Sequence, residues 1–196
     1  MPGPSWSRSC PATEPEPPHR AALAPNPVGA ARRRGRQARV PSVGLLDASW
    51  TVEFDAPRQQ VFDVAADVPA SPVWQPALMT VSTLETDERG RATLVDSSSD
   101  AKVKTTHQRL RFNYDDEPAG MNWVQEEGDT KSLEGSWTFE EIDGGERTRA
   151  TFALLADPGR VLGMLLRGPV EGKVKEFLTK GAAEGLKEHV ENNRES

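Results

Sequence analysis

The chain has 196 residues, 36% of them hydrophobic, and a mean hydropathy of −0.62, which is typical of one soluble domain with room for a tail. No apolar run approaches the roughly 20 residues that a membrane-spanning helix needs, and a single cysteine, Cys10, excludes an intrachain disulfide. The net charge of −6 is divided unevenly, because residues 1–46 hold seven arginines and two glutamates, a net +5, which leaves −11 on residues 47–196.

Residues 1–46 are predicted to be a disordered tail. Proline is concentrated there, as in "PATEPEPP", and "ARRRGRQAR" at residues 31–39 is strongly basic. So few apolar residues cannot offset the entropy that ordering the chain would cost. Three interpretations of the basic stretch stay open: an arm for nucleic acid or a membrane surface, a solvated tail, or a misassigned translation start with Val40 or Val43 as the true one. An intact Pro2 in the native protein would exclude the last.

An alternating strand and a helix open the predicted domain, residues 47–196. In "SWTVEF", Trp50, Val52 and Phe54 share one face, which is typical of a half-buried strand. The following "DAPRQQVFDVAADVP" has an apolar face at helical spacing, and Pro69 ends that helix.

A second, very short helix is predicted in "SPVWQP". Pro72 lies in its first turn, it contains Trp74, and Pro76 ends it. One strand is therefore followed by two short helices.

Six strands are predicted between Met79 and Leu155. They span residues 79–86, 91–97, 102–114, 120–127, 132–141 and 147–155. Turn sequences such as "DERG" and "DGGE" separate them, and short turns between successive strands indicate an antiparallel meander. Apolar and polar residues alternate in several strands, so one face of the sheet is expected to contact solvent. The pattern is least clear in residues 91–107, which contain few apolar side chains.

An amphipathic helix of about six turns, roughly 33 Å long, ends the chain. Its sequence is "VEGKVKEFLTKGAAEGLKEHVEN", with apolar residues at spacings of three and four. The small residues Gly181, Ala182 and Gly185 lie in its interior, although glycine costs about 1 kcal/mol there relative to alanine. They either leave volume for a ligand or let the helix approach the sheet closely, and both interpretations stay open.

Three segments of the chain resemble the START-like, polyketide cyclase/dehydrase (SRPBCC) superfamily. "FDAPRQQVFDVAADVPASPVWQP" is similar to its opening strand and helices, "LEGSWTFEEIDGGERTRATFAL" to its penultimate hairpin, and the last helix to its closing element. The resemblance covers about residues 47–196. It implies an α+β helix-grip fold, in which a seven-stranded antiparallel sheet curls around the long C-terminal helix. An apolar cavity lies between them, and the two short helices close one end.

The resemblance makes this cavity the candidate ligand site. The candidate contacts are Trp50, Trp74, Leu110, Phe112, Trp123, Trp137, Phe139, Met164, Phe177 and Gly181. Tryptophan rings can wall a cavity and offer flat surfaces for stacking, although each of them could equally fill a core. Trp74 is expected on the lid at the mouth, and Met164 beside the opening.

Catalysis on this scaffold would need a polar group inside the cavity. His107, Arg109 and Tyr114 are the candidates for a base or a cation that stabilises an enolate, as cyclisation of a poly-β-ketone requires. However, the alternation that turns Leu110 inward turns His107 and Arg109 outward and Gln108 inward. We therefore assign no catalytic residue, and no metal-ligand motif or phosphate-binding loop is apparent in the sequence.

Three classes of function stay open. The first is binding or carriage of a small apolar molecule such as a lipid, a quinone or a polyketide-like compound, with no cofactor or metal. The second is a cyclase, aromatase or dehydratase, and the third a protein-interaction or toxin-like regulator. We expect a cytoplasmic protein without a membrane span, whose domain at −11 repels nucleic acid. Ligand identity and oligomeric state are not predicted.

Overall fold

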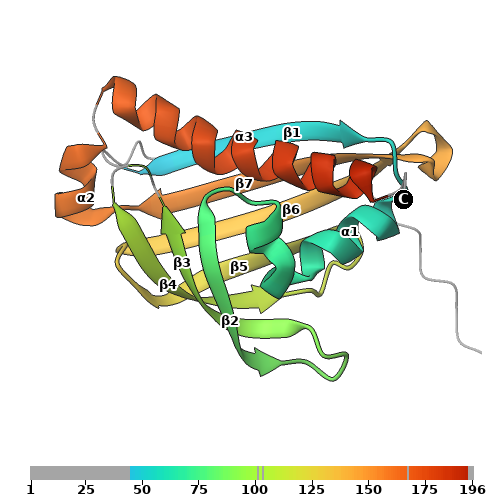
Figure 1. Cartoon of the computed structure of the whole chain (residues 1–196), viewed down its shortest axis with the longest axis horizontal. Coiled ribbons are helices and arrows are strands. Elements are labelled where there is room, and N and C mark those ends of the chain that lie inside the picture. Colours follow the sequence, from blue (N-terminus) through green and yellow to red (C-terminus); the bar gives the residue numbers. More distant parts are fainter. Residues whose placement is uncertain (1–44, 101, 103, 167, 194–196) are drawn as a thin grey trace, which may run out of the picture. The chain divides into compact units, whose positions relative to one another are not determined.

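A computed structural model describes residues 45–100, 102, 104–166 and 168–193 (Figure 1). The predicted tail lies outside the described residues except for its last two. The strands are β1 (Leu46–Phe54), β2 (Leu78–Thr86), β3 (Ala92–Asp100), β4 (Thr105–Asn113), β5 (Gly120–Gly128), β6 (Ser132–Ile142) and β7 (Arg147–Asp157). The helices are α1 (Arg58–Ala66), α2 (Gly159–Leu165) and α3 (Pro169–Asn192), with the 3-10 turns η1 (Val68–Val73) and η2 (Asp143–Gly145).

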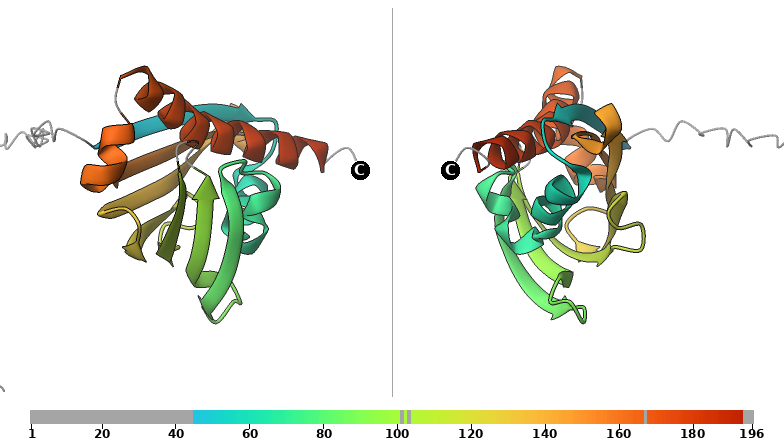
Figure 2. Two further views of the ribbon diagram at one scale, coloured as in Figure 1. Left: turned by 60° about the vertical axis from the view of Figure 1, so that its left-hand side comes forward. Right: turned by 90° about the vertical axis from the view of Figure 1, so that its right-hand side faces the viewer.

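The seven strands form one antiparallel sheet in the order β1-β7-β6-β5-β4-β3-β2. From β2 to β7 each strand pairs with the next, as the short turns predicted, and β1 closes the order beside β7. The sheet curls, and α3 runs across its concave side (Figure 2). At the two ends of α3, α2 lies near its N-terminus and α1 near its C-terminus (Figure 1). The predicted helix-grip fold is confirmed.

Three local details differ from the prediction. Strand β1 begins at Leu46, earlier than the alternating stretch that starts at Ser49, because the Leu46 side chain is buried against α2 and α3. The apolar segment before α3 forms the additional helix α2. Trp74 directly follows η1 instead of lying within it.

The glycines of α3 allow a close backbone contact. A Cβ atom at Gly185 would lie 1.9 Å from the carbonyl oxygen of Trp74, so no larger residue fits there without movement of the backbone. A Cβ at Gly181 would lie 3.3 Å from Pro76 Cγ. Of the two interpretations of these small residues, close approach is therefore correct. The surface approached is the Trp74–Pro76 segment and not the sheet.

Buried apolar side chains form two separate clusters. The main apolar cluster joins the middle of the sheet to α1 and to the C-terminal half of α3. Its largest fully buried side chains are Phe54, Val61, Phe62, Val95, Phe139, Leu186 and Val190. The small apolar cluster lies where β1 and β7 meet α2 and the N-terminal half of α3. It consists of Leu46, Ala156, Leu162, Leu166 and Val174.

Candidate functional site

A cavity lies between the concave face of the sheet, α2 and the N-terminal half of α3. Its volume is about 110 Å³, and all five residues of the small apolar cluster line it. An engineered apolar cavity of about 150 Å³ takes up benzene, and drug-sized pockets start at about 300 Å³. The space suits a ligand of about one ring, and a larger ligand would need side chains to move.

Five aromatic side chains from the main apolar cluster form a continuous wall of the cavity. We call them the aromatic belt; they are Phe112, Trp123, Phe152, Trp137 and Trp74. Successive ring centroids lie 5.4 Å, 5.6 Å, 4.9 Å and 6.5 Å apart in that order. The belt follows from strand pairing, because Phe112 lies opposite Trp123, and Trp137 lies opposite Phe152. The rings are inclined to one another by 27° to 64°, so each ring separately offers an apolar ligand a face on which to stack.

Gly135 allows one link of this belt. It lies opposite Trp123 in the β5–β6 pair, and a Cβ atom there would fall 2.2 Å from the Trp123 ring. The indole therefore lies across β6 and reaches Phe152 on β7. A side chain at position 135 would displace this ring from the cavity wall.

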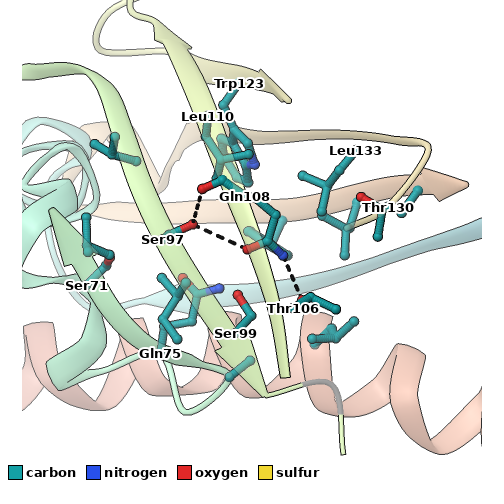
Figure 3. A pocket seen from close by; sticks show the side chains of 18 of the residues that line it. Ser71, Gln75, Ser97, Ser99, Thr106, Gln108, Leu110, Trp123, Thr130 and Leu133 are labelled. Atoms are coloured by element: carbon teal, nitrogen blue, oxygen red, sulfur yellow. Dashed lines mark hydrogen bonds between the residues drawn. The ribbon is translucent and has the colours of Figure 1, made fainter. Parts of the chain in front are cut away.

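Part of the wall formed by β3 and β4 is polar. Ser97 and Gln108 are cross-strand partners, and so are Ser99 and Thr106; all four line the cavity. The Gln108 Nε2–H donates to Thr106 Oγ1 at 2.9 Å, and the Ser97 hydroxyl lies 3.5 Å from Gln108 Oε1 (Figure 3). Gln75, between η1 and β2, is turned toward the same space (Figure 3).

The sequence pattern predicted only part of this polar wall. Alternation along the strand placed Gln108 on the inner face, and Thr106, two residues earlier, lies on the same face. In "DSSSD" the serines are identical on both faces, so Ser97 and Ser99 could not be distinguished from Ser98, which faces outward and bonds Thr80 at 2.6 Å.

Half of the predicted ligand contacts line the cavity. These are Trp74, Leu110, Phe112, Trp123 and Trp137. Trp74 is only 6% exposed and belongs to the main apolar cluster, so it does not form an open mouth as expected. Its ring packs against the Trp137 ring at 6.5 Å, and its carbonyl faces Gly185 on α3. Among the described residues, its indole N–H has no hydrogen-bond partner.

Trp50 and Phe139 lie away from the cavity. Trp50 is on the edge strand, where the residue is 36% exposed and its ring centre lies 5.2 Å from the ammonium group of Lys180 on α3. Phe139 is fully buried, and its ring packs between Phe62 at 5.9 Å and Trp137 at 5.7 Å. The alternation of each strand was predicted correctly, but α1 and α3 occupy the space in front of these two rings.

Met164, Phe177 and Gly181 also lie away from the cavity. Met164 is 61% exposed on the outer side of α2, because Leu162 and Leu166 occupy the inner side. Phe177 is half-buried beneath the ammonium group of Lys102, at 4.2 Å. Gly181 faces Pro76, as described above.

Two of the three candidate catalytic side chains are on the outer face. The side chain of His107 is 75% exposed, and its Nδ1 lies 3.5 Å from Asp129. Arg109 donates from Nε to Asp96 at 2.8 Å, and this hydrogen bond lowers the pKa of Asp96. The register shift in the β4–β5 pair falls on β5, where Glu126 is the extra residue. The alternation of β4 therefore continues undisturbed, and neither side chain reaches the cavity.

The third candidate, Tyr114, is buried but does not line the cavity. Its hydroxyl donates to the carbonyl of Ala92 at 2.8 Å, and the Arg91 guanidinium lies 4.4 Å from its ring centre. Burial raises the pKa of Tyr114 to about 12. A phenol that is held neutral and already bonded to backbone serves to pack the sheet, and it is in no position to act on a molecule in the cavity.

The described part of the chain gives two further findings. No group of three or more His, Cys, Asp or Glu side chains there is placed to hold a metal ion. No helix among these residues has the length and apolar character to cross a membrane.

Comparisons with known proteins agree with this architecture. A START superfamily protein from Mycobacterium smegmatis matches 75% of this chain and 98% of its own, at 19% identity and a TM-score of 0.64. A Thermus thermophilus protein matches 75% of this chain and 98% of its own, at 22% identity and a TM-score of 0.65. The Zhui aromatase/cyclase from Streptomyces sp. R1128 matches 76% of this chain and 96% of its own, at 20% identity and a TM-score of 0.64. At these identities the likeness shows the fold alone.

Sequence comparison identifies the family. None of the curated proteins matches the chain in sequence. Residues 54–180, which span the domain from the end of β1 into α3, match the family described as polyketide cyclase / dehydrase and lipid transport. The chain therefore belongs to the polyketide cyclase/dehydrase and lipid transport family.

Proposed function

We propose that the protein binds a small, mainly apolar molecule in the cavity between the sheet, α2 and α3. The observation that carries this proposal is the cavity itself, which has an aromatic belt on one side and the small apolar cluster on the other. The match to a family described by both cyclase/dehydrase chemistry and lipid transport supports a ligand-binding scaffold. A lipid fragment, a quinone or a polyketide-like compound are the candidate ligand classes.

The cavity lining supports binding in preference to catalysis. Cyclisation or dehydration needs an acid or base beside the reacting carbon. None of the described residues that line the cavity is an acid, a base or a histidine. His107 lies beside Asp129 and Arg109 pairs with Asp96, both on the outer face, and Tyr114 donates to backbone. A cyclase reaction on this scaffold is the alternative, and activity on a poly-β-ketone that is lost in His107→Ala would favour it.

Native mass spectrometry of the full chain, purified from the cells that express it, tests the proposal. We expect a species heavier than the polypeptide by the mass of one small molecule, and loss of that mass after mild denaturation. Titration with ethylbenzene, followed by ¹H–¹⁵N NMR, provides a test that does not depend on co-purification. If the protein carries no added mass and its spectrum does not change with ethylbenzene, the proposal is wrong.

A further inference from the structure

Among the described residues, the cavity lining combines several polar side chains with no charged one. None of the described residues that line it carries a formal charge, although the domain as a whole is rich in ion pairs. Ser71 and Thr130 also line the cavity, but their hydroxyls donate to Val68 O and Gln125 Oε1. The other polar side chains come from β3, from β4 and from the segment between η1 and β2. We call Ser97, Ser99, Thr106, Gln108 and Gln75 the polar cluster.

The hydrogen bonds within the polar cluster leave donors and acceptors unused. The Gln108 amide has two N–H donors and an oxygen with two lone pairs. One N–H donates to Thr106. Among the described residues, the amide oxygen is approached only by the Ser97 hydroxyl, at 3.5 Å, and this hydroxyl also lies 3.4 Å from the Gln108 backbone oxygen. Within the described part of the chain, the side chains of Ser99 and Gln75 have no hydrogen-bond partner. The cluster can therefore both donate to and accept from a bound molecule.

Burial makes this capacity selective. Gln108 is 7% exposed and Thr106 is 3% exposed, so a bound group that meets them is withdrawn from water. A neutral hydroxyl or carbonyl recovers its hydrogen bonds there at little cost. A carboxylate or phosphate would lose its hydration and meet no cation among the described lining residues, which costs several kcal/mol even after relaxation.

We infer that the ligand is an uncharged molecule with a hydroxyl or carbonyl group at one end and an aromatic or otherwise apolar body. The polar end binds Gln108 and its neighbours in the polar cluster, and the body stacks on the aromatic belt. This inference rests on the proposed function and adds the chemical class of the ligand. It excludes free fatty acids and phosphorylated lipid headgroups as groups bound inside the cavity.

Three probes separate these classes: ethylbenzene, 2-phenylethanol and phenylacetate. Each has one ring, and they share one carbon skeleton, so they differ only at the polar end. Their affinities for the full chain are measured by NMR titration at pH 7.5. We expect 2-phenylethanol to bind at least about tenfold more tightly than phenylacetate. Gln108→Leu should lower the ratio of 2-phenylethanol to ethylbenzene affinity by about fivefold, the equivalent of one net hydrogen bond.

Two further variants keep this test decisive. Ser99→Ala removes one unpartnered hydroxyl from a half-buried site and should lower the same ratio, which matters if Gln108→Leu does not fold. Ser98→Ala is the matched control, because it lies between two cluster members but faces outward, and it should leave the ratio unchanged.

The remaining outcomes distinguish the inference from the proposed function. If ethylbenzene binds and neither Gln108→Leu nor Ser99→Ala changes the ratio, the inference is overturned and the proposed function stands. The same holds if phenylacetate binds as tightly as 2-phenylethanol. If none of the three probes binds, both are overturned.

Discussion

The two apolar clusters use the same helix in opposite ways. In the main cluster, α3 contributes side chains such as Leu186 and Val190 that are at most 1% exposed and do not line the cavity. In the small cluster, α3 contributes Val174, and every member borders the cavity. The C-terminal half of α3 is therefore packed directly onto the protein, whereas the N-terminal half stands over an unfilled space. The cavity lies between the densely packed main cluster and the loosely packed small cluster.

The largest expected difference between these halves comes from shortening leucines. Leu186→Ala should lower the free energy of unfolding by about 3–5 kcal/mol, because it empties a fully buried site. Leu178→Ala, in the half that lines the cavity, should cost about 1 kcal/mol, since its side chain is already half-exposed. Urea denaturation measures both. Equal losses would mean that the two halves of α3 are packed alike.

Glycine replacements give the next largest effect, and they differ in sign. Gly185→Ala should destabilise the fold by about 1–3 kcal/mol, because its Cβ would meet the Trp74 carbonyl oxygen. Gly172→Ala, on the same helix with no neighbouring atom within 4 Å, should stabilise it by up to about 1 kcal/mol. Thermal unfolding of the two variants measures the difference. A stabilising Gly185→Ala would contradict the tight contact with Trp74.

A smaller effect on stability is expected from a larger side chain at the cavity wall beside the small cluster. Leu178→Phe adds volume at the cavity wall and should weaken ethylbenzene binding by about tenfold, with a change in unfolding free energy of about 1 kcal/mol or less. Val170→Phe, on the exposed side of the same helix, is the control that should leave binding unaltered. Unchanged binding in Leu178→Phe would place the ethylbenzene site elsewhere.

The last expected effect is confined to alkaline pH and to the main cluster. Burial raises the pKa of Tyr114 from its ordinary value of 10.0 to about 12, so the unfolded chain loses this proton first. The stability that depends on the neutral phenol is complete below pH 10 and is lost as the pH rises through about 12. Unfolding free energies of the wild type and Tyr114→Phe between pH 9 and 12 should diverge in slope. Parallel curves would show that Tyr114 titrates normally.

The sequence predicted the fold more fully than the site. Strand alternation and turn residues gave the meander, and helical spacing gave α3, because both patterns are local. Strand alternation also predicted correctly that His107 and Arg109 face outward. For Trp50 and Phe139, the predicted face of the sheet was correct but the predicted contact with the cavity was wrong. Which element packs on each ring depends on where α1 and α3 cross the sheet. The prediction that Met164 lies beside the cavity was wrong because the rotation of the short helix α2 decides which of its side chains face inward.

The separation of the two clusters has a thermodynamic consequence. A molecule that binds only the folded chain adds about 2.7 kcal/mol to its stability at a concentration 100 times its dissociation constant. Since it would supply the contacts missing between the clusters, its effect should be concentrated on α2 and the start of α3. Amide hydrogen exchange in α2 should slow when the cavity is occupied, while exchange around Leu186 changes little. The melting temperature of a preparation then reports how much of the protein is loaded.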